Sequence, residues 1–300
     1  MQSIEFVNHA SVILSNGNTS MLTDPWYEGD VFNKGWQLLH EFNDDEIVSI
    51  INRVNYIWIS HEHPDHFSII FFKKYSSLLI KKGIKIIFQN TFDKRVITFL
   101  KSLKLDVIEL RDNTEMKLDE NFIIKIIKVD FYDSALIAQI DKTKIINLND
   151  CPISSKRDLI KFKKRSGEAD ILLSQFSYAA WKGGKNNIEW RKAAAKEKLL
   201  IIQNQADILK CKKIIPFASY IYFSNKENEY LNDSVNNSRK VLEFFKNKSN
   251  EIYFMRPFEK QILTNLIQSK TSLDFWDQKF HKISEYKQTN YEKSFTLSEL

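Results

Sequence analysis

Three of the six histidines fall in the stretch Ser60-His61-Glu62-His63-Pro64-Asp65-His66, where a carboxylate lies between the second and the third. The preceding run, Val54–Ile59, is short and rich in β-branched and aromatic residues, which predicts a buried strand. His61 and His63 are two positions apart, so extended backbone directs both imidazoles to the same side. Imidazole nitrogen and carboxylate oxygen suit zinc, iron or manganese. The stretch therefore predicts a site for two metal ions.

A second interpretation of the same stretch needs no metal. In it, Asp65 caps a helix that starts near Phe67, and the histidines lie on a surface loop. Neutral imidazole is the commonest metal ligand, and so dense a group of histidines is unusual. We therefore prefer the metal site.

The composition indicates a folded protein with a sizeable core. The chain has 300 residues, 43% of them hydrophobic, with seven glycines and five prolines. Its net charge is +6, but basic and acidic residues are interspersed. This balance favours an anionic small-molecule substrate and does not demand a nucleic acid partner.

Two features predict a cytoplasmic protein. The two cysteines, Cys151 and Cys211, are too few for a disulfide scaffold and suit a reducing compartment. The N-terminus has no secretory signal pattern, and we find no apolar run of about 18 residues that could span a membrane.

The elements that position the metal site follow the pattern of an α/β protein with two sheets. In the first half strands and helices alternate, whereas in the middle three strands follow one another, which indicates a second, largely antiparallel sheet. We expect one domain over residues 1–300, with a helical C-terminal extension from about residue 260. Strands are expected over 4–14, 20–23, 54–59, 84–88, 107–110, 122–129, 134–140, 144–148, 169–176, 214–223 and 251–254, and helices over 44–53, 67–82, 91–103, 158–164, 188–210 and 233–246.

Other polar residues lie at predicted strand ends. Asp150 follows the strand 144–148, where a carboxylate could bridge two metal ions, although Asn-Asp-Cys-Pro is also ordinary turn chemistry. Asp24, before Pro25, is equally ambiguous. His9 lies inside the first predicted strand, where a packed, hydrogen-bonded role is the commoner one. We retain His9 as a candidate substrate contact.

A glycine and lysine-rich loop precedes the long helix predicted from Ile188. Trp181-Lys182-Gly183-Gly184-Lys185 combines free N–H groups with cationic side chains, which predicts an anion-binding site at Lys182 and Lys185. A flexible loop with solvated lysines explains the pattern equally well.

Beyond these patterns, His61-x-His63-x-Asp65-His66 after a buried strand resembles the signature of the metallo-β-lactamase superfamily. The segments 147–151, 183–190 and 216–220 are similar to the catalytic part of the CMP-N-acetylneuraminate hydroxylase family and its bacterial relatives. The likeness extends from about Ile4 to Pro257. It implies a four-layer αββα sandwich, in which His61 and His63 bind one ion, Asp65 and His66 bind the second, and Asp150 bridges them.

The chain departs from that pattern in two places. Superfamily members usually have a histidine before the strand 134–140, where this chain has Asp130-Phe131-Tyr132-Asp133; either aspartate could replace it as a ligand. Oxygen ligands there would shift preference toward iron or manganese over zinc. A second histidine is expected after the Pro-Phe-Ala segment, where Asn225 is a poor ligand but a candidate substrate contact.

Three hypotheses about function follow. The resemblance implies a di-iron oxygenase that hydroxylates an acidic amino sugar or its nucleotide, with electrons from a separate donor protein, because Cys151 and Cys211 cannot hold a Rieske cluster. Alternatively, a metal-bound hydroxide attacks an ester, phosphodiester or amide, with Asp65 or Asp150 orienting the water. A metal-poor binding or scaffold protein is the third. We favour the oxygenase.

Overall fold

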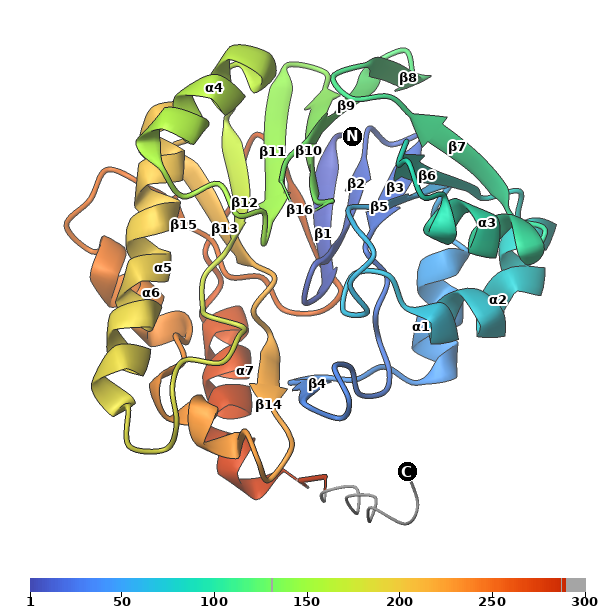
Figure 1. The fold of residues 1–300 in the computed structure, drawn as a ribbon. Helices are drawn as coiled ribbons and strands as arrows, with labels where there is room; N and C mark the ends of the chain where they lie inside the picture. Colours follow the sequence, from blue (N-terminus) through green and yellow to red (C-terminus); the bar gives the residue numbers. More distant parts are fainter. Residues whose placement is uncertain (131, 287, 290–300) are drawn as a thin grey trace, which may run out of the picture.

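The computed structural model describes residues 1–130, 132–286, 288 and 289, which form two large sheets covered by helices. The sheets lie face to face, with helices on both outer sides (Figure 1). This is the predicted four-layer αββα sandwich, and that prediction is confirmed. The first sheet has the strand order β16 (Glu259–Ile262), β1 (Ser3–Asn8), β2 (Ser11–Ser15), β3 (Ser20–Thr23), β5 (Tyr56–Ile59), β6 (Lys85–Gln89) and β7 (Asp106–Leu110).

The second sheet begins with parallel strands and ends with antiparallel ones. Its order is β15 (Glu251–Ile252), β13 (Lys213–Phe217), β12 (Ile171–Gln175), β11 (Thr143–Asn149), β10 (Ser134–Ile140), β9 (Phe122–Lys128) and β8 (Glu115–Asp119). A small separate ribbon pairs β14 (Ile221–Phe223) with β4 (Trp36–Leu38).

Successive side chains of the strands point alternately into the core between the sheets and toward the outside. The outward-facing apolar side chains are covered by helices. In β5, Ile57 and Ile59 pack with the helices of the first sheet, whereas Trp58 points into the core between the sheets. The first sheet is covered by α1 (Asp44–Ile51), α2 (Ile69–Lys81) and α3 (Arg95–Ser102), and the second by α4 (Lys156–Ser166) and α5 (Ile188–Leu209) (Figure 1). The remaining helices lie at one end of the sandwich: α6 (Ser238–Phe245), α7 (Lys270–His281) and the 3₁₀ helices η1 (Glu229–Ser234) and η2 (Lys282–Glu285).

Strands of both sheets end at one common edge. In the first sheet β3, β5, β6 and β7 are parallel, and β1 runs in the same direction. In the second sheet β11, β12 and β13 are parallel, and the turn between β9 and β10 lies at the same end. Side chains that follow these strands are thereby brought together across the sandwich, as in other parallel sheets.

Several element predictions were wrong in detail. The predicted strand 4–14 is two strands, β1 and β2, with His9 and Ala10 in the turn between them. The predicted strand 214–223 is split into β13 and β14, and β8 was not predicted. The C-terminal segment expected to be helical begins with strand β16, and its residues 290–300 lie outside the described residues.

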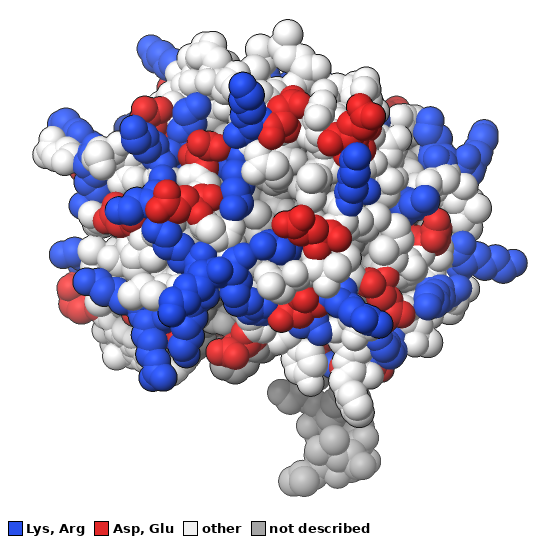
Figure 2. Space-filling view, turned by 90° about the horizontal axis from the view of Figure 1, so that it is seen from above, with Lys and Arg blue, Asp and Glu red and all other residues white. Residues whose placement is uncertain are grey.

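Charges over the surface are mixed. Seen from above, basic and acidic side chains are interspersed (Figure 2), as the sequence suggests. Both cysteines are buried and unpaired. Among the described residues, no helix is both long and apolar enough to cross a membrane.

Candidate metal centre

The histidine-rich stretch forms a tight turn between β5 and α2. The backbone N–H of His66 donates to the carbonyl oxygen of His63 at 2.9 Å, which folds the stretch back on itself. Helix α2 is capped by Ser68, whose side chain accepts from the N–H of Phe71. Asp65 is instead 4% exposed and directed at other site residues. The interpretation of Asp65 as a helix cap is therefore wrong.

One group of possible ligands consists of His61, His63 and Asp133. The Nε2 atom of His61 lies 2.8 Å from Nδ1 of His63, and its Nδ1 lies 3.6 Å from Oδ1 of Asp133. His61 and Asp133 are buried, whereas His63 is exposed. One atom from each of the three lies within 4.8 Å of the others, close enough to share an ion.

A second group consists of His9, Asp65 and His66. Oδ2 of Asp65 lies 3.4 Å from Nε2 of His9 and 3.3 Å from Nε2 of His66. All three side chains are buried.

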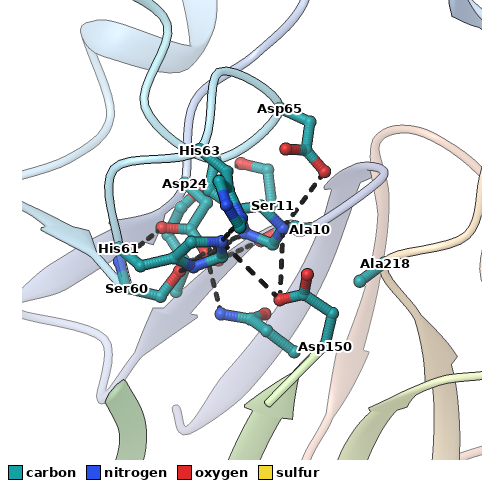
Figure 3. A network of polar contacts seen from close by, with 12 residues as sticks. Ala10, Ser11, Asp24, Ser60, His61, His63, Asp65, Asp150 and Ala218 are labelled. Atoms are coloured by element: carbon teal, nitrogen blue, oxygen red, sulfur yellow. Dashed lines mark hydrogen bonds and ion pairs between the residues drawn. The ribbon is translucent and has the colours of Figure 1, made fainter. Parts of the chain in front are cut away.

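Asp150 lies between the two groups. Its Oδ1 is 3.4 Å from Nε2 of His66 and 3.9 Å from Nε2 of His61. Figure 3 shows Asp150 pointing from the end of β11 toward the histidines of the facing sheet. A carboxylate in this place has the geometry to bridge two ions.

Asp24, at the end of β3, orients this centre from behind. Its two carboxylate oxygens accept hydrogen bonds from the backbone N–H and the hydroxyl of Ser60, each at 2.7 Å, and from the side-chain amide of Asn149 at 2.8 Å. Nδ1 of His66 donates to the same carboxylate at 2.9 Å, which leaves Nε2 facing Asp65 and Asp150. A carboxylate behind a histidine is a common way to hold a metal ligand.

Several buried polar atoms at this centre make no hydrogen bond with any described residue. A buried polar atom without a partner costs about 1–3 kcal/mol, so a cluster of them calls for a bound group. The four carboxylates of Asp24, Asp65, Asp133 and Asp150 can also balance the charge of two divalent ions. The atoms are Nδ1 and Nε2 of His9, Oδ1 of Asp65, Nε2 of His66, Oδ1 of Asp133 and Oδ1 of Asp150.

Burial and neighbouring charges shift the pKa values of these groups. Burial, with the neighbouring His66, lowers the pKa of His61 to about 3, so its imidazole is neutral and able to bind a metal. Burial disfavours a charge on His66, but the carboxylates of Asp150 and Asp65 outweigh it and raise its pKa. Burial and the nearby Asp150 raise the pKa of Asp133 to about 7. The carboxylates thus favour a cation at the centre.

A cavity of about 450 Å³ opens beside the centre. Asp65 and Asp150 of the centre line this cavity, as do two lysines, Lys182 from the loop before α5 and Lys198 from α5 itself. The ammonium of Lys198 donates to Oε1 of Gln175. Aromatic residues complete the wall: Phe32, Trp36 and Tyr178.

The other predicted site residues lie elsewhere. Asp130 is exposed and belongs to none of the ligand groups, and Phe131 lies outside the described residues. The side chain of Asn225 accepts from the N–H of Glu227 in a turn, outside this cavity.

The two loop lysines are separated. Lys182 lines the cavity beside the metal centre, whereas Lys185 lines a different cavity of about 710 Å³. The N–H of Gly184 donates to the side chain of Asn187, the residue that precedes α5, so it is not free to bind an anion there.

Two residues at the centre were not selected from the sequence. Asp24 carries the same signal as Asp150, an aspartate at a strand end, but it also precedes Pro25, where an aspartate is an ordinary turn former. Lys198 gives no signal, because it is one of several lysines in a long helix. Backbone strain, visible only in the structure, marks the same edge: His9, Asp24, Asn149 and Ala218 all have positive φ, between 25° and 49°.

Comparison with known proteins gives both a sequence relative and structural neighbours. No protein-family model matches the chain. Cytidine monophosphate-N-acetylneuraminic acid hydroxylase of Xenopus laevis is 26% identical over 249 residues, which cover 77% of this chain and 40% of the hydroxylase. The chain thus spans less than half the length of the curated relatives that it matches.

Two solved structures share the fold. CmlA, a diiron β-hydroxylase from Streptomyces venezuelae, superposes with a TM-score of 0.60 at 13% identity, over 87% of this chain and 54% of CmlA. The metallo-β-lactamase fold protein YhfI from Bacillus subtilis has a TM-score of 0.56 at 13% identity, over 87% of this chain and 98% of YhfI. At these identities the likeness is one of fold.

Proposed function

We propose that the chain is a dinuclear metal enzyme of the metallo-β-lactamase-fold superfamily, and specifically a di-iron oxygenase. Its substrate in this proposal is an anionic small molecule such as an acidic amino sugar or its nucleotide. The hydroxylase relatives and the di-iron neighbour CmlA support this choice over a hydrolase.

The strongest support is the convergence of six proposed ligand side chains, four of which have buried atoms without a hydrogen-bond partner among the described residues: Asp65, His66, Asp133 and Asp150. In our assignment His61, His63 and Asp133 hold one ion, Asp65 and His66 hold the second, and Asp150 bridges them. Each ion then has imidazole nitrogens and carboxylate oxygens as ligands. This mixture, with one of the usual histidines replaced by Asp133, favours iron or manganese over zinc.

Bound iron would supply the reduction of dioxygen: one oxygen atom enters a C–H bond of the substrate as a hydroxyl group, and the other leaves as water. The balance requires two further electrons and two protons, which we assign to a separate electron-donor protein. Within the described residues, the buried Cys151 and Cys211 offer no cysteine pair for an iron–sulfur cluster.

The chain's own residues bind and orient the substrate in the cavity beside the centre. The ammonium of Lys198 is held by Gln175, and burial lowers its pKa while Asp150 opposes that shift. A carboxylate or phosphate of the substrate would replace Gln175 as its partner, with Lys182 as a second cation. The aromatic wall offers Trp36 and Tyr178 for contact with a sugar ring or a base.

Metal content and product analysis together test this proposal. We would purify the protein without air or added metal and measure bound metals by elemental mass spectrometry. The protein would then receive air, a chemical reductant and CMP-N-acetylneuraminic acid as the probe, and mass spectrometry would follow the gain of one oxygen atom. The control is the His61→Ala, His63→Ala double variant, which lacks two proposed ligands.

We expect bound iron and an oxygenated product. The double variant should lose the ion that His61 and His63 hold, and with it the product. Bound zinc together with cleavage of a chromogenic phosphodiester would replace the oxygenase with the hydrolase. A wild-type protein that holds no metal after anaerobic reconstitution would overturn the metal-enzyme proposal as a whole.

A further inference from the structure

We propose that His9 is a protein ligand of the second metal ion, together with Asp65 and His66. It supplies the imidazole that this chain lacks after the Pro216–Ala218 segment. The inference rests on the proposed function only in requiring that the chain bind two metal ions.

The His9 ring lies close to both other proposed ligands of the second ion. Its Nε2 lies 3.4 Å from Oδ2 of Asp65, which itself lies 3.3 Å from Nε2 of His66. These separations exceed a normal hydrogen bond but suit three atoms arranged around one ion. The ring is 2% exposed and packs edge-on against Trp26, which fixes its orientation.

The His9 ring is also buried without hydrogen bonds to the described residues. Neither ring nitrogen has a hydrogen-bond partner among the described residues, although both are buried. A histidine buried only for packing normally donates or accepts at least one hydrogen bond. Nε2 of His66 and Oδ1 of Asp65 are unsatisfied beside it, so three side chains present unused ligand atoms to the same point.

The backbone at His9 is strained. His9 adopts a φ of 25°, which is uncommon for a non-glycine residue. Its N–H donates to the side chain of Asn8 at 2.9 Å, and its carbonyl oxygen accepts from the N–H of Ala218, also at 2.9 Å. These contacts hold a strained turn at the centre, as expected where the position of a side chain is required for function.

The contact with Ala218 also explains how His9 replaces the missing histidine. In the sequence that histidine was sought after Ala218, but Asn225 lies outside the cavity beside the centre. Ala218 is drawn beside Asp150, with Ala10 of the β1–β2 turn nearby (Figure 3). The turn after β1 therefore reaches the side of the centre that the end of β13 borders.

Metal stoichiometry tests the inference without an activity assay. We would reconstitute the wild type and His9→Ala with ferrous iron in the absence of air and measure bound metal after desalting. Two ions are expected for the wild type, and loss of one is expected for His9→Ala. The matched control is His40→Ala, since His40 packs between Phe42 and Phe275 outside every ligand group; it should retain both ions.

A second variant keeps the test decisive if His9→Ala does not fold. In His9→Cys loaded with cobalt, a thiolate ligand would add a near-ultraviolet charge-transfer band that is absent from cobalt-loaded wild type and His40→Cys. Such a band supports the inference. A fully loaded His9→Ala variant, or a folded and cobalt-loaded His9→Cys variant without the band, overturns it. A wild type that binds no metal would instead refute the proposed function.

Discussion

At the scale of single residues, the carboxylate of Asp24 determines how His66 faces the centre. It accepts from Nδ1 of His66, from Ser60 and from Asn149, and it is 1% exposed. With its Nδ1 proton committed to Asp24, His66 directs Nε2 at the centre, and a metal ion bound there would take the place of the Nε2 proton.

We expect Asp24→Asn to weaken the binding of one of the two ions by about 10–100-fold, because an amide cannot accept all of these hydrogen bonds. Anaerobic titration against a competing chelator would measure the two affinities. The control is Asp119→Asn, a carboxylate bonded to Asn16 and Thr19 at the surface, which should bind both ions normally. Unchanged affinities in a folded Asp24→Asn protein would contradict this role.

Residue by residue, the sequence was most informative where ligands are close together along the chain. The stretch from His61 to His66 could be recognised because its spacing is local. Asp24 could not be distinguished from a turn former, since its partner Asn149 is 125 positions away. His9 was misplaced because the turn at His9 and Ala10 contains neither glycine nor proline, the residues that most clearly mark the end of a strand.

At the scale of elements, Arg191 joins helix α5 to the loop that carries Lys182. This arginine is 0% exposed, and its guanidinium donates to both carboxylate oxygens of Asp233 and to the carbonyl oxygens of Gly184 and Lys185. The loop is therefore tied to the helix, which differs from the flexible loop considered from the sequence.

Replacing Arg191 with leucine should lower the free energy of unfolding by about 2–3 kcal/mol, because hydrogen bonds to charged groups are lost and Asp233 is left without its partner. Urea unfolding followed by circular dichroism would measure the change. Lys192→Ala, which removes an exposed neighbour paired with Glu189, is the control and should have no measurable effect. An equally silent Arg191 variant would mean that the loop is held by other contacts.

At the scale of the whole molecule, the proposed ligands come from both sheets. His61 and His66 follow β5 of the first sheet, whereas Asp133 and Asp150 flank β10 and β11 of the second. The order and type of most elements, and hence the sandwich, could be predicted from periodicity and from the resemblance. The split strands could not, since tertiary contacts determine where they break.

Because the ions link the two sheets in our proposal, their removal should destabilise the whole fold. An ion present at about 100 times its Kd contributes about 2.7 kcal/mol, which for a chain of this size corresponds to a fall in Tm of roughly 4 °C for each ion on chelation. Scanning calorimetry in the absence of air, with and without chelator, would measure it. The His61→Ala, His63→Ala variant should respond much less, and equal Tm values for loaded and chelated wild type would exclude this link.

The convergence of strand ends at one edge also bears on how the protein is made. The contact between His9 and Ala218 joins residues from the beginning and the last third of the chain, so translation at about 5–20 residues per second needs at least ~10 s between them. During that interval the nascent chain exposes His61 to His66 before Asp150 or Ala218 exists. In our proposal, metal delivered on the ribosome would meet only part of the site, so both ions would bind after Asp150 and Ala218 have been synthesised.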